Sequence, residues 1–242
     1  MNHDFKIANC DTDSIMFCKS DMTPFSEEEQ QNLIDEINGL LPDKIKFAHD
    51  GYFLDVLICK AKNYALNDGK KLKIKGSALV ASQKEKALKK FIDEVINLLL
   101  KDQGDSVLPL YNEYVKLIFN IEDISQWCSK KSITKKVLNP ERTNEQKVFN
   151  AIEGSEYKEG DKIYVYYTPD GALKLQENYI KDHDPQVFLK KLFKTIEIFK
   201  NVLNISPFLN YSLVKNMNIA REIAGLAPII KEKKSKKKLE NS

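Results

Sequence analysis

The chain has 242 residues, of which 42% are hydrophobic and 30% are charged, and its formal net charge is +3. A chain of this length can bury a core and form one or two domains, and the composition is typical of a soluble globular protein. The sequence has no apolar run long enough to cross a bilayer and no charged-then-apolar leader, so we expect a cytoplasmic protein with no membrane partner. The four cysteines lack zinc-finger spacing, which argues against a metal-thiolate site or a disulfide framework.

The first predicted elements are two short strands, 5–8 and 15–18, which flank the polar stretch 9–14 and indicate a β-hairpin. Asp11 and Asp13 lie at its turn. Two carboxylates this close repel each other unless a cation neutralises them, and Mg²⁺ prefers such hard oxygen ligands. Paired metal ions serve phosphoryl or nucleotidyl transfer. Asp also caps turns through its own side chain, so the spacing alone leaves a purely structural role open.

A helix is predicted next, because Ser26 and Glu29 form a capping box ahead of an apolar face. Strand-like segments follow over 45–48 and 52–59. The turn 67–69, Asn-Asp-Gly, then predicts a second hairpin. Its second strand alternates lysines with apolar residues, which gives the hairpin one basic face.

From residue 82 onward, apolar residues recur with helical spacing, and we place a domain boundary at 81. Trp127 is expected to anchor the core. The stretch 127–136 is basic and predicted to be extended, and lysines there are either phosphate contacts or a solvated loop. The remaining predicted elements are helices at 82–104, 106–119, 143–152, 184–203 and 212–224, a strand at 160–167, and a disordered lysine-rich tail.

Four motifs, in this order, resemble the C-terminal part of family B DNA polymerases. Asp-Thr-Asp-Ser at 11–14, followed by an apolar strand, resembles the third palm motif, in which Tyr-Gly usually stands where this chain has Asn9-Cys10. Lys62 and Tyr64 resemble the Lys-x-Tyr motif, and Lys75-Gly76 the Lys-Gly pair that follows it. Ser-Lys-Lys-Ser-Ile-Thr-Lys, at 129–135, resembles a thumb segment that lies along the duplex.

The resemblance implies an α+β fold. Residues 1–81 would form the C-terminal part of a palm, with antiparallel β-hairpins and a packed helix. Residues 82–228 would form a mainly helical thumb with a small β element, and 229–242 a disordered basic tail.

The resemblance also implies site residues. Asp11 and Asp13 would be catalytic and would ligate two Mg²⁺ ions, for which Mn²⁺ could substitute. The residues expected to bind DNA are Lys62, Tyr64, Lys75, Gly76, Lys130, Lys131, Thr134, Lys135 and Lys136.

The implied activity is DNA-directed DNA polymerisation, a nucleotidyl transfer on primer-template DNA and deoxynucleoside triphosphates. The sequence shows no counterpart of the other palm carboxylate motif, of the fingers or of the exonuclease acids. We therefore expect one subunit of a split polymerase that depends on an N-terminal polymerase subunit carrying the exonuclease, the rest of the palm and the fingers. A split gene of this kind is expected in a phage, acting in the host cytoplasm, or in an archaeon. Replication accessory proteins are further candidate partners.

Two alternatives remain open at this point. One is a noncatalytic DNA-binding or processivity protein, in which the acid pair is only a turn. The other is a metal-dependent nuclease that uses the same carboxylates.

Overall fold

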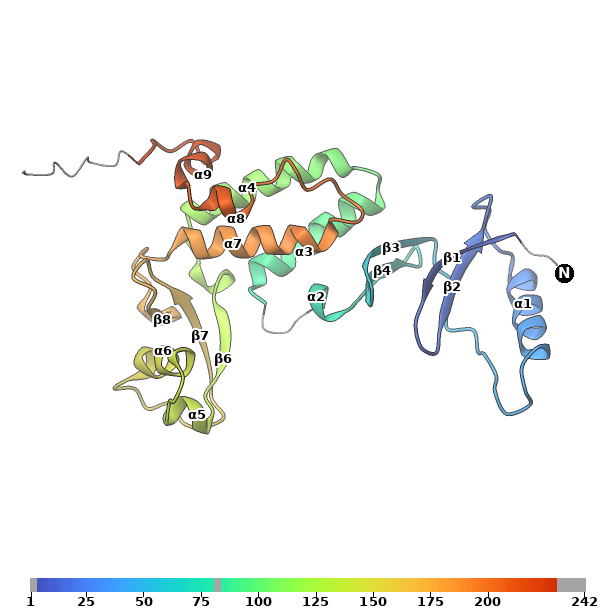
Figure 1. Ribbon diagram of the computed structural model, residues 1–242, viewed down its shortest axis with the longest axis horizontal. Coiled ribbons are helices and arrows are strands. Elements are labelled where there is room, and N and C mark those ends of the chain that lie inside the picture. Colours follow the sequence, from blue (N-terminus) through green and yellow to red (C-terminus); the bar gives the residue numbers. More distant parts are fainter. Residues whose placement is uncertain (1–3, 81–83, 230–242) are drawn as a thin grey trace, which may run out of the picture. The chain divides into compact units, whose positions relative to one another are not determined.

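A computed structural model of the chain describes residues 4–80 and 84–229 (Figure 1). Within these residues the chain forms two compact units. The first unit comprises 4–80, 92–104 and 198–204, and the second comprises 84–91, 105–197 and 205–229. The predicted domain limits stay predictions, and the basic tail predicted over 229–242 lies, from residue 230, outside the described residues.

The first unit begins with the predicted hairpin. Strands β1 (Phe5–Cys10) and β2 (Ile15–Lys19) pair antiparallel, with Cys10 opposite Ile15 next to the turn. Helix α1 (Glu27–Gly39) follows, and the capping box of Ser26 and Glu29 is confirmed. Three acidic residues in its first turn also complement the helix dipole.

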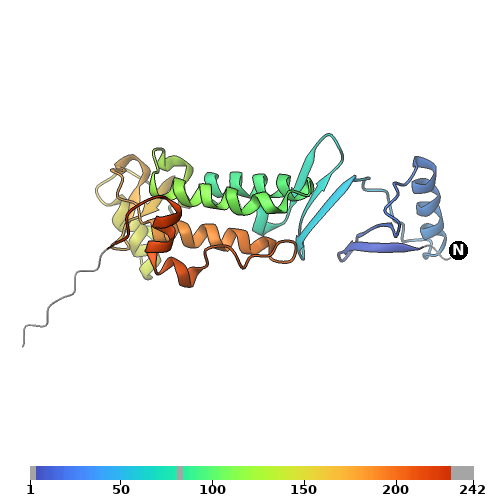
Figure 2. The same cartoon turned by 90° about the horizontal axis from the view of Figure 1, so that it is seen from above.

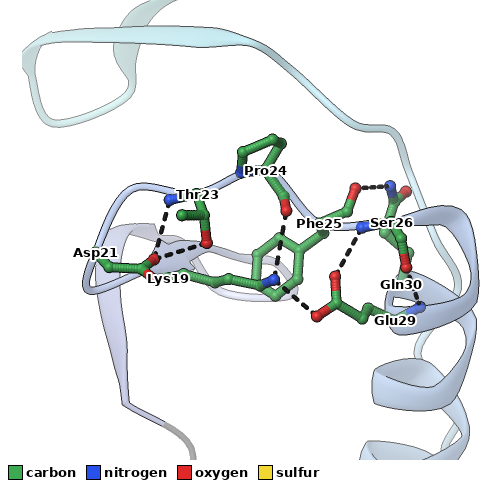
Figure 3. A network of polar contacts seen from close by, with 8 residues as sticks. All are labelled: Lys19, Asp21, Thr23, Pro24, Phe25, Ser26, Glu29 and Gln30. Carbon is green, nitrogen blue, oxygen red and sulfur yellow. Dashed lines mark hydrogen bonds and ion pairs between the residues drawn. The ribbon is translucent and has the colours of Figure 1, made fainter.

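Side chains of the intervening loop fix how the hairpin leads into α1 (Figure 3). Lys19 Nζ lies 2.7 Å from Glu29 Oε1, donates to the Pro24 carbonyl at 3.3 Å, and lies over the Phe25 ring. The Phe25 ring in turn contacts those of Phe5 and Phe17. An aromatic cluster and one ion pair therefore hold the hairpin to the helix start.

A second, three-stranded antiparallel sheet has the order β3 (Asp55–Lys60), β4 (Asn63–Asn67), β5 (Leu72–Lys75). The predicted turn at 67–69 is confirmed, and Asn67 Oδ1 accepts from the Gly69 amide there. The short helix α2 (Ser77–Val80) follows β5. The strand predicted over 45–48 is wrong, because Asn38 takes both the amide and the carbonyl of Phe47 and so removes them from strand pairing.

The buried residues of the first unit lie from residue 59 onward. No side chain from residue 4 to 58 is buried, and Ile7 and Leu54 are 66% and 62% exposed. Helix α3 (Lys86–Leu100) gives the unit its residues from Ile92 onward. The core members are Cys59, Ala65, Leu66, Leu79, Ile92, Val95, Ile96, Ile198 and Phe199.

The second unit is largely helical. Helices α4 (Val107–Phe119) and α7 (Pro185–Ile196) pack side by side, the green and orange ribbons of Figures 1 and 2. Trp127 is 5% exposed and contacts the rings of Tyr114 and Phe188, which confirms it as a core anchor.

The helix predicted over 212–224 is divided. Helix α8 (Tyr211–Val214) ends before Asn216, and α9 (Met217–Ile223) begins after it. The side chain of Asn216 accepts from the Asn218 amide and so caps a new helix start. Short 3₁₀ helices occupy Gly104–Ser106, Ile124–Gln126, Gln176–Asn178 and Glu197–Phe199.

A small antiparallel sheet completes the second unit, in the order β6 (Ser129–Ser132), β7 (Lys162–Tyr167), β8 (Leu173–Leu175). Helices α5 (Lys135–Leu138) and α6 (Thr143–Ile152) share its hydrophobic core. The prediction of an extended segment over 127–136 is correct for β6. It is wrong for its last residues, because Thr134 precedes a helical turn and Lys135 begins it.

Candidate functional site

The first candidate site is the turn of the β1–β2 hairpin. The Asp11 amide donates to the Ser14 carbonyl at 2.9 Å and closes the turn. None of residues 9–14, all of them described, has a positive φ. The turn therefore forms without the backbone freedom that Gly would give at the position of Cys10.

The two acids of this turn, here called the acid pair, have different surroundings. Asp11 Oδ1 accepts from the Thr12 amide at 2.9 Å and lies 3.4 Å from Lys62 Nζ. The Thr12 hydrogen bond, aided by the Lys62 charge, holds the pKa of Asp11 below its ordinary value, so this carboxyl is anionic at neutral pH. Asp13 is exposed, and across the described residues no hydrogen bond or ion pair reaches its carboxylate. Both carboxylates can therefore accept a cation.

Lys62 reaches the acid pair from the turn between β3 and β4, where it adopts a left-handed backbone with φ 59°. Gly76 has φ 107°, and a Cβ there would lie 2.2 Å from the Lys62 carbonyl oxygen. This approach requires glycine. Tyr64 and Lys75 face each other across the β4–β5 pair. One sheet thus brings together the Lys-x-Tyr and Lys-Gly motifs and sets a lysine against Asp11.

Sequence reasoning missed Asn63, the residue within the Lys-x-Tyr motif. It is 6% exposed, and its carboxamide bonds to the Ala61 carbonyl and the Ala78 amide. A polar residue at the start of a strand was its sole signal in the sequence.

The remaining predicted DNA-binding residues lie in the second unit. Lys130 and Lys131 are half-buried on β6, and Lys130 is opposite Tyr164, which is exposed. Thr134, Lys135 and Lys136 are exposed. Lys135, Lys136 and Arg142 line a cleft of about 300 Å³ with Asn139, Glu141 and Glu145. Together, Lys130, Lys131, Lys135, Lys136 and Arg142 form a basic surface that could bind a phosphate backbone.

A buried ion pair, also missed from the sequence, holds the start of β6. Glu85 is 5% exposed, and its Oε1 lies 2.5 Å from Lys191 Nζ and accepts from Ser129 Oγ at 2.6 Å. Burial acts to raise the pKa of Glu85, but the Lys191 charge and the hydrogen bonds from Lys191 and Ser129 outweigh it, so the pKa lies below its ordinary value. Ser129 directly precedes the two lysines of β6.

A cleft in the first unit is separate from the candidate site. It measures about 480 Å³ and lies between the hairpin and α1, and neither member of the acid pair lines it. Its carboxylates are already engaged, since Asp21 accepts from Thr23 and Glu29 from Lys19 and Ser26 (Figure 3). These contacts give the cleft a structural role.

The acid pair supplies hard oxygen ligands but not a complete metal site. Within residues 4–80 and 84–229, no three His, Cys, Asp or Glu side chains come together as a metal-binding group. Mg²⁺ is held in many sites by one or two carboxylates, with water and substrate phosphates as its other ligands. The donor set therefore fits Mg²⁺ as part of a larger site.

Comparison with known proteins bears on the fold. No protein-family model and no curated protein matches the chain. Among solved structures, the chain is similar to the family B DNA polymerase from the hyperthermophilic archaeon Pyrobaculum calidifontis, with a TM-score of 0.62 and 16% sequence identity. The match covers 84% of this chain and 27% of that polymerase chain. The predicted α+β fold is confirmed, and it is similar to part of a polymerase. Over the described part of the chain, no helix is both long enough and apolar enough to span a membrane.

Proposed function

We propose that this chain is the C-terminal subunit of a split DNA-directed DNA polymerase of the family B type. One observation carries the proposal. The acid pair at the hairpin turn lies beside Lys62, in the same unit that pairs Tyr64 with Lys75. The similarity of the fold to part of a DNA polymerase supports it.

In this proposal the acid pair binds the metal ions. The β3–β4–β5 sheet and the β6–β7–β8 sheet bind DNA. Asp11 and Asp13 would hold Mg²⁺ or Mn²⁺, which would lower the pKa of the primer 3′-hydroxyl and offset charge on the α-phosphate of the deoxynucleoside triphosphate. The hydroxyl attacks that phosphorus and pyrophosphate leaves. Lys62 and Lys75 contact phosphates near the primer end, and Tyr64 packs on sugar. The basic surface of the second unit holds the duplex without reading its sequence.

The proposal also includes a second chain. Catalytic carboxylates must converge from several elements, and the acid pair has no third ligand among the described residues. The segment 4–58 buries no side chain, although it contains a sheet and a helix. A partner carrying the rest of the palm, the fingers and the exonuclease would supply both missing parts. An exposed sheet edge also favours such pairing.

Primer extension by the assembled enzyme tests the proposal. The tagged chain is recovered from its native lysate with its partner and assayed with Mg²⁺ and deoxynucleotides. Asp13→Asn should reduce extension by at least about 100-fold, the scale of losing one transition-state-stabilising group, and leave duplex affinity unchanged or higher. Asp35→Asn, an exposed acid on α1, is the matched control and should extend normally.

If a wild-type complex binds duplex but never extends a primer, the polymerase proposal fails and the noncatalytic DNA-binding protein stands. If Asp13→Asn extends a primer as well as wild type, the acid pair has only a structural role in the hairpin turn.

A further inference from the structure

We infer that Asn63 is a positioning residue that fixes the backbone of Lys62 and so directs its ammonium group to the acid pair and the duplex. The part that concerns DNA rests on the proposed function. Asn63 begins β4, directly after the turn that contains Lys62. It is 6% exposed. Because water does not reach its polar carboxamide, the carboxamide needs hydrogen-bond partners inside the protein.

Each half of the Asn63 carboxamide has a different partner. Nδ2 donates to the Ala61 carbonyl at 2.8 Å, which spans Lys62. Oδ1 accepts from the Ala78 amide at 2.8 Å, in α2. One side chain thus joins the β3–β4 turn to the segment that follows β5. A side chain with only a donor or only an acceptor could not replace it.

The Lys62 backbone is held from two sides. On one side, the Asn63 carboxamide ties the preceding residue, Ala61. On the other, Gly76 approaches so closely that a Cβ would lie 2.2 Å from the Lys62 carbonyl oxygen and 2.5 Å from Asn63 Oδ1. Lys62 has φ 59°, which non-glycine residues rarely adopt unless the surroundings impose it. Lys62 is the second residue of the two-residue β3–β4 turn, and Asn63 and Gly76 hold the turn in this conformation.

The direction of the Lys62 side chain follows from this backbone. The side chain is 73% exposed and has few contacts to hold it in place, yet its Nζ lies 3.4 Å from Asp11 Oδ1. Relaxation of Lys62 to an ordinary φ would turn its Cβ and carry the ammonium away from the acid pair. Asn63 therefore acts on the site through Lys62 and touches no substrate itself.

Two readouts on the full chain test this inference. The first is the backbone conformation of Lys62, measured by NMR from its HN–Hα coupling and carbon shifts. Asn63→Ala should abolish the left-handed signature of Lys62. Asn67→Ala removes an equivalent amide at the other end of β4, where it bonds to Gly69 and Asp55, and should leave that signature intact.

The second readout is duplex affinity by fluorescence anisotropy, with the partner chain present. Asn63→Ala should weaken binding about fivefold, the equivalent of one hydrogen bond. In the Lys62→Ala background the same substitution should have no further effect, because the residue that it positions is gone. Asn63→Asp keeps the acceptor and loses the donor to Ala61, and it should reproduce the loss.

The outcomes separate the inference from the proposed function. A left-handed Lys62 retained in Asn63→Ala, or a fivefold loss that persists in the Lys62→Ala background, overturns the inference. Circular dichroism establishes that each variant is folded. Gly76→Ala should also abolish the left-handed signature of Lys62, and it replaces Asn63→Ala if that variant is too unstable to assay. A wild-type complex that binds no duplex refutes the proposed function, and the NMR readout then still decides whether Asn63 fixes Lys62.

Discussion

Removal of Lys191 should destabilise the second unit through the charge that it leaves behind. In Lys191→Met, the Glu85 carboxylate stays buried and keeps the Ser129 hydroxyl as its hydrogen-bond donor. Breaking a buried ion pair on one side costs roughly 3–5 kcal/mol, because an uncompensated charge remains. We expect the lower end, about 3 kcal/mol, because 28% of the Lys191 side chain is exposed and water screens part of the interaction.

The pH dependence identifies the cause of that loss. The folded-state pKa of Glu85 lies below its ordinary value of 4.5, so the pair stabilises the protein fully above that value. The contribution disappears as the pH falls through the folded-state pKa. In Lys191→Met the opposing Lys191 charge is gone, so burial should raise the pKa of Glu85. As the pH falls, Glu85 should therefore be protonated earlier in the variant than in wild type, which removes the buried charge. The stability difference between wild type and variant should therefore be largest at pH 7 and shrink toward pH 4.

Urea unfolding of the full chain at pH 7 and pH 4 measures both effects. Lys194→Met, an exposed lysine on the same helix, is the matched control and should change stability by less than about 0.5 kcal/mol. Glu85→Gln combined with Lys191→Met completes a double-mutant cycle that isolates the pair. A loss below about 1 kcal/mol in Lys191→Met, or a loss that is equal at both pH values, would refute a buried ion pair.

Two further predictions concern buried polar groups. Tyr111→Phe removes the hydroxyl that donates to the Leu209 carbonyl at 2.9 Å, and it should cost about 1–2 kcal/mol in urea unfolding; an unchanged stability would mean that the bond contributes nothing. Burial raises the pKa of the Cys59 thiol to about 11 and that of Cys128 to about 12, so iodoacetamide at pH 8 should alkylate exposed Cys10 and spare both until the chain is unfolded. Peptide mass spectrometry measures this, and rapid labelling of Cys59 in the folded chain would contradict it.

Local signals in the sequence were sufficient for the hairpins and most helices. Ser26 and Glu29 satisfy each other three residues apart, and Asn67 bonds two residues ahead. Such contacts depend on the chain nearby and can be predicted from spacing. The strand predicted over 45–48 failed because its competitor, Asn38, belongs to the preceding helix. The single helix predicted over 212–224 was wrong for a local reason, because an Asn can stand inside a helix or cap a new one, and Asn216 does the latter.

The candidate site shows a similar division. The resemblance marked Asp11, Lys62 and Gly76, but it could not say that Lys62 turns toward Asp11, because that contact joins a hairpin turn to another sheet. It also gave no reason to select Asn63, whose hydrogen-bond partners are Ala61 in the β3–β4 turn and Ala78 in α2. Contacts between distant parts of the chain are properties of the folded protein, and no periodicity encodes them.

The pattern of apolar residues and the burial that they achieve differ most in the segment 4–58. Alternation and capping predicted its hairpin and helix correctly, yet Ile7 and Ile15 on the hairpin and Leu40 at the end of the helix remain exposed. A two-stranded hairpin is marginally stable in water unless it packs on further surface. The same segment carries the acid pair, whose ligand set is also incomplete. In the proposed polymerase one partner chain would satisfy both needs, since a partner surface packed on this hairpin would bury its apolar side chains and bring further carboxylates to its turn.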